Sequence, residues 1–363
     1  FEAALPSELF VEGPNVVAVE AHQAAATSSD LAFALWLGDG GGDVDVDLFG
    51  MGPERDWVIN GNYPDRALFR NKLSFDLYQS FGGVECYAPQ VVLCEAILDG
   101  QWQGVFTWGE RIKRDDDRVP LVEDELDLGR SFIVKNDDGG GGIVESPSGY
   151  GEWFPVYPRV GELSDQAEEG IVEALAAWEA AALGDDPGDP DSGIFAWMEL
   201  DSAVDWVLIQ ELSKNNDAYF LSIHVTRDVD GLLRFVPWDH DLAYGGYPVG
   251  NCGPADWIAY RPLLVAGMAT VPAFRERLVE RWTELRADQL SQATILGLVD
   301  GYYETMGDAA YTNFEVWPMD DIEFSWDGIN WLCPVSSVDE EKVRFEEWLL
   351  ARLAWMDANI EEY

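Results

Sequence analysis

The chain is poor in basic side chains. Its 363 residues include 22 lysines and arginines against 68 aspartates and glutamates, so the formal net charge is −46 at pH 7. A surface this acidic repels phosphate backbones and anionic lipid headgroups. The composition therefore argues against a nucleic-acid binder, and an anionic ligand would need a local basic pocket or a metal ion.

Histidine and cysteine are also scarce. Three histidines are too few to complete a common zinc site, and the four cysteines form no CxxC pair. An even cysteine count is compatible with two disulfides in an oxidising compartment, Cys86 with Cys94 and Cys252 with Cys333. Four buried free thiols are the alternative, and the sequence leaves both open.

No apolar run approaches the roughly 20 residues that a membrane-spanning helix needs, so we expect no membrane span. Hydrophobic residues make up 47% of the chain and aromatic residues 13%. This composition is typical of a globular protein with a substantial core.

The predicted elements change in type along the chain. Val91–Ile97 and Trp102–Trp108 are apolar runs around Asp99-Gly100, which predicts a β-hairpin. Helical spacing predicts helices over residues 65–82, 164–183, 202–215, 271–289, 293–312 and 338–361. Strands first and helices later, without regular alternation, predict an α+β fold.

Two acidic segments are candidate sites. Asp217 follows a predicted helix in the run Asn-Asn-Asp, and Trp238-Asp-His-Asp follows a predicted strand. If that strand continues, alternation places the carboxylates of Asp239 and Asp241 on one side, where both could bind a hard divalent cation. The alternative for the second segment is a solvated turn with a buried tryptophan.

A third candidate is a basic cluster. Residues 110–118 hold four of the 22 bases, and in an acidic chain such a cluster is where phosphate could bind. Three aspartates, Asp115 to Asp117, lie inside the cluster. An internally neutralised loop is therefore the alternative.

Several of these segments resemble, in the same order, the motifs of the CotH kinase family, which is named for spore-coat protein H. The matching segments are Asp45–Met51 with Asp56–Val58 for LLGM…DWVL, Leu68–Asn71 for LxRN, Gly104–Val119 for GVYxLxEKIKRDxxRV, Glu211–Ser222 for ELxxNxDxYxxS and Pro237–Gly245 for PxWDxDxAxG. No single motif decides the likeness, but their number and common order make it specific.

The resemblance implies an atypical protein-kinase-like fold that binds ATP and Mg²⁺, with Mn²⁺ or Ca²⁺ as alternatives, and transfers the γ-phosphate to Ser or Thr of a protein. Asp217 matches the family's catalytic acid near the acceptor hydroxyl. Asp239 and Asp241 match its metal-binding acids. We expect Trp238 to pack near the nucleotide.

The basic cluster receives roles from the same resemblance. Glu110 and Lys113 match the family's ExIKR motif, and Lys113, Arg114 or Arg118 is expected to contact phosphate. These roles agree with the needs of phosphoryl transfer, which combines a positioned hydroxyl, metal clamps and cationic stabilisation.

The chain departs from the family pattern in two places. Leu31–Leu37 has no base where many members carry a lysine, and Ser222 stands where some members carry an asparagine for a second metal. A catalytically inactive extracellular structural or surface-assembly protein is therefore the alternative function.

The first forty residues resemble the tail of a β-sandwich module common in secreted bacterial proteins. We therefore expect a strand segment over residues 1–40, a kinase-like domain over residues 41–363, and an extracellular or cell-surface location. The expected partner is a protein carrying a Ser or Thr acceptor, or a surface-assembly partner, and not a nucleic acid.

Overall fold

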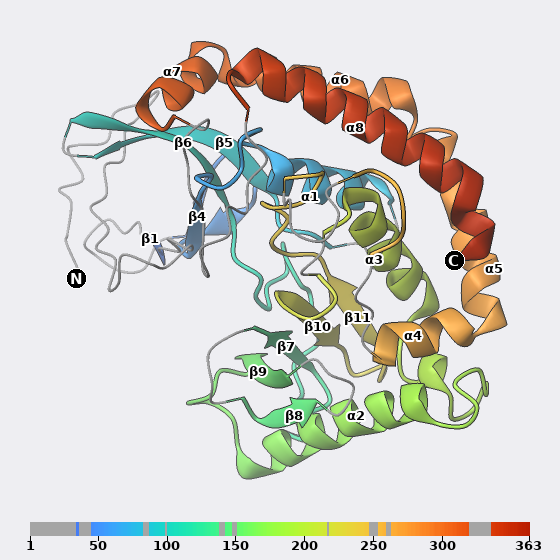
Figure 1. Ribbon diagram of the computed structural model, residues 1–363. Helices are drawn as coiled ribbons and strands as arrows, with labels where there is room; N and C mark the ends of the chain where they lie inside the picture. Colours follow the sequence, from blue (N-terminus) through green and yellow to red (C-terminus); the bar gives the residue numbers. More distant parts are fainter. Residues whose placement is uncertain are drawn as a thin grey trace, which may run out of the picture.

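The computed structural model describes residues 34–35, 45–82, 87–98, 100–137, 142–146, 151–215, 218–246, 253–258, 263–318 and 335–363. Asp217, three of the four cysteines and nearly all of residues 1–40 lie outside these ranges, so the predictions for them remain predictions. The fourth cysteine, Cys94, lies in the described part of the chain and is a free thiol, so the prediction of a disulfide between Cys94 and Cys86 is wrong. Antiparallel sheets fill the first half and helices dominate the second (Figure 1), which confirms the α+β prediction.

The first sheet contains the predicted hairpin. Its spatial order is β1 (Ala34–Leu35), β4 (Trp57–Gly61), β6 (Gln101–Glu110) and β5 (Val91–Leu98), all antiparallel. The β5–β6 turn includes Gly100, whose φ of 75° a residue with a side chain rarely adopts. A separate short pair, β2 (Val46–Asp47) and β3 (Pro53–Glu54), precedes β4.

The second sheet is also antiparallel. Its order is β11 (Leu233–Val236), β10 (Ile223–Arg227), β7 (Phe132–Asn136), β9 (Gly151–Tyr157) and β8 (Val144–Ser146). The sequence predicts strands over Ser222–Arg227 and Leu232–Pro237 on either side of the turn Asp228–Gly231, and β10 and β11 confirm them, whereas β7 and β9 were not predicted. The run Phe132–Asn136 opens with three buried apolar residues in succession, so it lacks the alternation that marks a strand with one solvated face.

The helices are α1 (Arg70–Ser80), α2 (Asp165–Leu183), α3 (Leu200–Ser213), α4 (Leu263–Thr270), α5 (Pro272–Arg286), α6 (Gln292–Met306), α7 (Asp308–Val316) and α8 (Val338–Asn359), with short 3₁₀ turns at Ile194–Ala196 and Ile360–Glu362. Ser164 caps α2 by accepting a hydrogen bond from the Ala167 amide, as its sequence predicts. The helix expected over residues 293–312 is two helices, because Gly307 takes a φ of 49° between them. No helix among the described residues is long and apolar enough to cross a bilayer.

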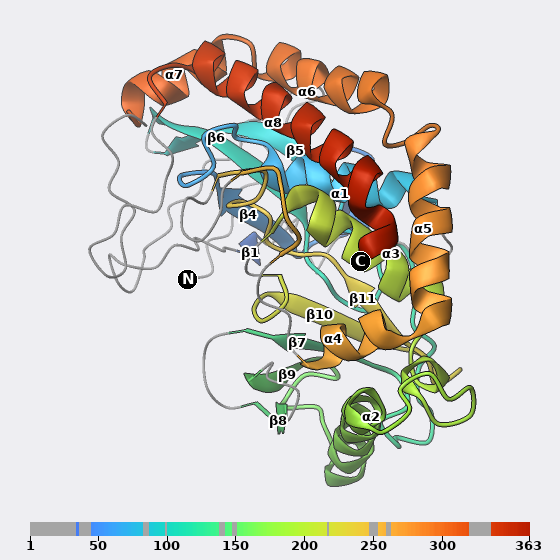
Figure 2. The same ribbon diagram turned by 45° about the vertical axis from the view of Figure 1, so that its right-hand side comes forward.

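The helices cover the two sheets on different sides. Figures 1 and 2 show α6, α7 and α8 along the side of the first sheet, where α7 contacts β6. At the other end of the molecule α2 packs against β8 of the second sheet, and α3 packs against β11 and α1. Helices α1 and α3 therefore form the centre of the molecule.

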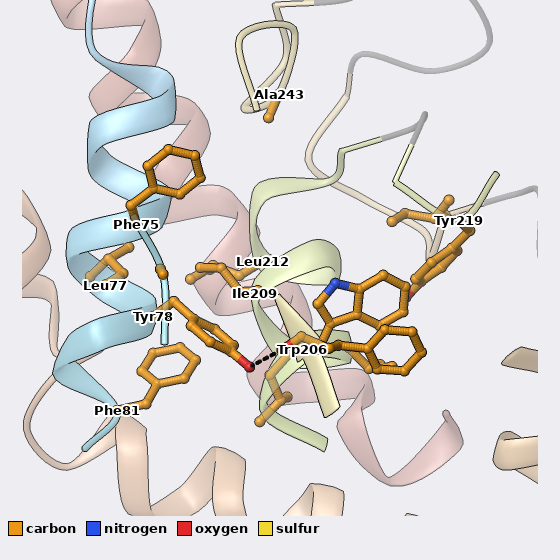
Figure 3. Packing of buried hydrophobic residues seen from close by; sticks show 14 of the residues in the cluster. Phe75, Leu77, Tyr78, Phe81, Trp206, Ile209, Leu212, Tyr219 and Ala243 are labelled. Carbon is orange, nitrogen blue, oxygen red and sulfur yellow. Dashed lines mark hydrogen bonds between the residues drawn. The ribbon is translucent and has the colours of Figure 1, made fainter. Parts of the chain in front are cut away.

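The central packing is aromatic (Figure 3). Trp206 of α3 stacks on Phe235 of β11, with ring centroids 3.9 Å apart, and Tyr78 of α1 donates a hydrogen bond to the Phe235 carbonyl at 3.5 Å. Twelve residues of α3, from Ser202 to Ser213, are buried. A helix that is buried all round is typical of the interior of a large domain, and here it fixes α1 against the second sheet.

A buried ion-pair network joins α1 to α8. The Arg70 guanidinium pairs with Asp65 and, at 2.6 Å, with Glu341, and Arg344 also pairs with Glu341 at 2.7 Å. Burial acts to raise the pKa of Glu341, but the two guanidinium groups outweigh it and hold that pKa below its usual value. Arg70 also donates to the Ala243 carbonyl at 2.9 Å, which anchors the loop after β11.

Candidate active site

A cavity of about 300 Å³ lies where the two sheets meet. Its walls come from β4 of the first sheet and the segment after β6, from β7, β9 and β10 of the second sheet, from α1, and from the loop after β11. Ligand pockets in proteins span roughly 300–1,000 Å³, so the cavity has the size of a small-molecule site.

Three acidic side chains line the cavity. Asp239 and Asp241, in the loop after β11, both line it, as does Asp137 after β7. Asp239 takes a left-handed φ of 58°, so the loop is not the continued strand that the sequence suggested. The two predicted metal-binding acids nevertheless reach one cavity.

The backbone around Asp239 is held in an unusual conformation. Ser222 also has a positive φ, 56°, and its hydroxyl donates to Oδ2 of Asp239 at 3.0 Å. The side-chain amide of Asn215 donates to the Asp239 carbonyl at 2.8 Å. A non-glycine residue in this region costs about 1–3 kcal/mol, and such residues cluster at functional sites.

Side chains of α1 hold the acidic loop, residues 237–241, in place through His240. Asn71 accepts a hydrogen bond from the His240 amide at 2.6 Å, and the Ser74 hydroxyl lies 2.8 Å from Nδ1 of His240. Burial lowers the pKa of His240 to about 3, so this imidazole is neutral at physiological pH. His240 thus fixes the loop from the core while its two acidic neighbours line the cavity.

Two basic side chains line the same cavity. Lys135 on β7 pairs with Asp137, Nζ to Oδ2 at 2.7 Å, and Arg111 after β6 pairs with Asp56, Nη1 to Oδ2 at 3.0 Å. The sequence did not single out Lys135. Its strand was not predicted, and a single lysine in an apolar run gives no signal of its own. Arg111 belongs to the predicted basic cluster, but phosphate contact was expected of its neighbours.

Aromatic and apolar groups complete the lining. Trp238 stacks on Phe75 of α1, with centroids 6.0 Å apart and an interplanar angle of 18°. His224 of β10 meets Trp238 edge-on at 5.8 Å. Burial, and to a smaller extent the charge of Lys135, lowers the pKa of His224 to about 3, so it contributes a neutral polar edge.

Four other predicted site residues are absent from the described cavity lining. Glu54 of β3 pairs with both Arg118 and Lys113, the latter at 2.5 Å. Arg118 is buried, lies 3.7 Å from Glu110 and sits over the Trp57 ring. Lys113 and Arg118 therefore belong to an ion-pair network between β3 and the segment after β6, which we call the Glu54 network.

Glu110 and Arg114 have structural partners as well. Buried Glu110 accepts hydrogen bonds from the Gln90 amide at 2.9 Å and from the Tyr87 hydroxyl at 3.3 Å, and burial raises its pKa. Arg114 donates to the Leu121 carbonyl at 2.8 Å and lies over the Tyr157 ring. Of the eight predicted site residues, the structure thus brings Trp238, Asp239 and Asp241 together.

The acidic side chains of the cavity fit a hard divalent cation. Within the described ranges no group of three or more His, Cys, Asp or Glu side chains is placed to hold a metal ion. Mg²⁺, however, is commonly held by one or two carboxylates, with water and substrate phosphates as its other ligands. Asp239 and Asp241 supply that number of carboxylates.

The chain is thus an α+β protein in which two antiparallel sheets meet at a cavity that acidic and basic side chains line. Residues 32–356 match the model of the CotH kinase protein family. Because the match covers most of the chain, the protein belongs to the CotH kinase family and is kinase-like. No curated protein matches the chain significantly.

Proposed function

We propose that this protein is a secreted or surface-exposed kinase that transfers the γ-phosphate of ATP to Ser or Thr of another protein, with Mg²⁺ as its metal. The observation that carries the proposal is that acidic and basic side chains line the same cavity. Asp239 and Asp241 line it together with Lys135. A metal–nucleotide complex carries both a cation and phosphate oxygens, so it complements both sets of side chains.

The side chains suit the steps of phosphoryl transfer, which depends on positioning and on electrostatic stabilisation. Asp239 and Asp241 would hold the metal ion, which neutralises phosphate charge when bound. Lys135 would exchange its contact with Asp137 for a phosphate oxygen. Asp217, predicted to orient the acceptor hydroxyl, belongs to the same proposal and lies outside the described residues.

The rest of the lining suits a nucleoside. Val58 of β4, Ile112 after β6 and Val156 of β9 contribute apolar surface from both sheets, and Trp238 contributes an aromatic edge. Apolar and aromatic side chains in a binding site give a base a surface to pack against, while neighbouring polar groups fix its orientation. The apolar side chains therefore support a nucleotide over a bare phosphate.

An inactive surface-assembly protein is a second candidate function. The observation that favours it is the Glu54 network, because Lys113 and Arg118 are committed to Glu54. In this case the fold persists without nucleotide binding. The acidity of the chain supports an extracellular setting in both cases.

The test is a calorimetric titration of ATP, with Mg²⁺ or Mn²⁺, into the wild type and Asp239→Asn. The matched control is Asp230→Asn, which removes an exposed aspartate that pairs with Arg234 in the β10–β11 turn. We expect metal-dependent binding that Asp239→Asn abolishes and Asp230→Asn preserves. Absence of binding to folded wild-type protein at several salt concentrations would overturn the kinase proposal in favour of the assembly protein.

A further inference from the structure

Two guanidinium groups converge on one carboxylate beside the cavity. Arg111 follows β6 in the first sheet, and Arg159 follows β9 in the second. Nη1 of Arg111 lies 3.0 Å from Oδ2 of Asp56, and Nη2 of Arg159 lies 4.0 Å from the same oxygen. The two side chains are 44% and 62% exposed, whereas that of Asp56 is 8% exposed. Both cations are therefore accessible to a ligand from solvent.

This arrangement carries a surplus of positive charge. Asp56 is the one carboxylate within ion-pair distance of either guanidinium in the described part of the chain, so two cations share one anion. Arg277 of α5 shows the opposite balance, because it lies within 4 Å of Asp201, Glu280 and Glu284. In a chain of net charge −46, this pair of arginines is a local excess of positive charge.

The surplus lies at the mouth of the cavity. Arg111 lines the cavity itself, and Arg159 is three residues beyond Val156, which also lines it. The high exposure of both arginines places them towards solvent. Planar guanidinium groups bind phosphate and carboxylate oxygens through paired hydrogen bonds. Two of them, one from each sheet, form a fork suited to a single oxyanion.

We propose that Arg111 and Arg159 form an anion site at the cavity mouth, which binds an acidic side chain, carboxylate or phosphate, next to the acceptor hydroxyl of the substrate protein. The assignment to the acceptor rests on the proposed kinase function, which gives the metal ion to Asp239 and Asp241 and a phosphate contact to Lys135. An acidic acceptor would otherwise be repelled by this chain. The site thus selects acceptor segments rich in negative charge.

The anion site is tested without metal or nucleotide by calorimetric titration of pyrophosphate. We compare the wild type with Arg111→Gln and Arg159→Gln, and with Arg277→Gln, which removes the same charge from α5, away from the cavity. Each site variant should bind about tenfold more weakly, because a charged hydrogen-bond pair is lost, and the control should not change. Equal affinities in all four proteins, or no binding to the wild type, would overturn the site.

The source of the anion is tested with two labelled peptides that contain serine and differ only in flanking aspartates or asparagines. Fluorescence anisotropy gives their affinities, and calorimetry gives that of Mg²⁺–ATP. We expect Arg159→Gln to lower the affinity for the acidic peptide about tenfold and to leave the affinities for the neutral peptide and for Mg²⁺–ATP unchanged. A loss of ATP affinity with unchanged peptide affinities would overturn the acceptor assignment and give the site to the nucleotide. These readouts need no phosphoryl transfer, so failure of the kinase proposal, judged with Asp239→Asn, remains distinguishable.

Discussion

The acidic loop after β11 and the basic segment after β6 have the same kind of sequence signal and different positions in the fold. Both are short charged runs that follow a strand. In the loop, Asp239 and Asp241 line the cavity, with buried His240 between them. In the basic segment, Lys113 and Arg118 turn to Glu54. A charged run in the sequence supplies the side chains that a binding site needs, but the positions of their partners in the fold decide whether these charges face a ligand.

Glu54 explains the difference in physical terms. It lies on β3, far from the basic segment in sequence, and its side chain is 4% exposed. A buried carboxylate needs a paired cation, and two bases of the cluster meet that need. In the acidic loop, the Ser222 hydroxyl donates a hydrogen bond to the carboxylate of Asp239, and the Asn215 side-chain amide donates one to the Asp239 backbone carbonyl.

We expect the largest effect from a substitution that breaks the Glu54 network. Arg118→Met removes a buried cation and leaves Glu54 and Glu110 with less compensation, so the free energy of unfolding should fall by about 3 kcal/mol or more. Urea denaturation measures the change. Arg277→Met, on the surface of α5, should lose no more than about 1 kcal/mol. Unchanged stability of Arg118→Met, together with weaker nucleotide binding, would show that Arg118 serves the ligand and not the fold.

The next effect compares two lysines of equal charge. Lys135→Met removes the cation that lines the cavity, and Lys113→Met removes one from the Glu54 network. We expect the affinity for Mg²⁺–ATP, measured by calorimetry, to fall about tenfold or more in the first variant and to stay within about twofold in the second. The reverse order would restore the role that the sequence assigned to Lys113.

How far the sequence could lead depends on the range of the interactions. The β5–β6 hairpin and α2 were predictable because their signals are local, namely Asp99-Gly100 and the cap residue Ser164. The carboxylates of Asp239 and Asp241 were placed on one cavity by a motif three residues long. Lys135 was missed because β7 has no alternation, and the partners of Lys113 depend on a contact with another strand. Local pattern predicted elements, whereas pairing across the fold set the site.

A smaller effect is the difference in the pH dependence of stability between the cavity wall, through His224, and the Glu54 network. Folded His224, in the cavity wall, takes up a proton only near pH 3, whereas the unfolded chain does so near pH 6.5. The unfolded state therefore binds more protons between these values, and stability falls as pH drops below about 6.5. The pKa of Glu54 is held below 4.5, because Lys113, Arg118 and a backbone amide together outweigh its burial. The stabilisation from this carboxylate persists down to about pH 4.5 and is lost below it.

Urea denaturation between about pH 6.5 and pH 5 isolates the histidine contribution. As the pH falls, the free energy of unfolding of the wild type should decrease by up to about 1.4 kcal/mol per pH unit more than that of His224→Gln, because unfolding of the wild type takes up one more proton. Glu54→Gln should retain the wild-type slope in this range and differ from it only at lower pH. Parallel slopes for the wild type and His224→Gln would mean that the cavity wall does not exclude the charged imidazole.

The smallest effect concerns the hydrogen bond that orients the acidic loop. Ser222→Ala removes the hydroxyl that donates to Asp239 at 3.0 Å, and partners behind a metal ligand contribute about tenfold to metal affinity. We expect Mn²⁺ affinity, measured by electron paramagnetic resonance in the presence of ATP, to fall by about that factor, with ATP binding in the absence of metal unchanged. Ser192→Ala is the matched control, because its hydroxyl also donates to an aspartate, Asp189, at 2.9 Å but on an exposed loop. Equal Mn²⁺ affinities of the two variants would mean that the loop holds Asp239 through its backbone alone. The hydrogen bond from Ser222 to Asp239 would then have no part in metal binding.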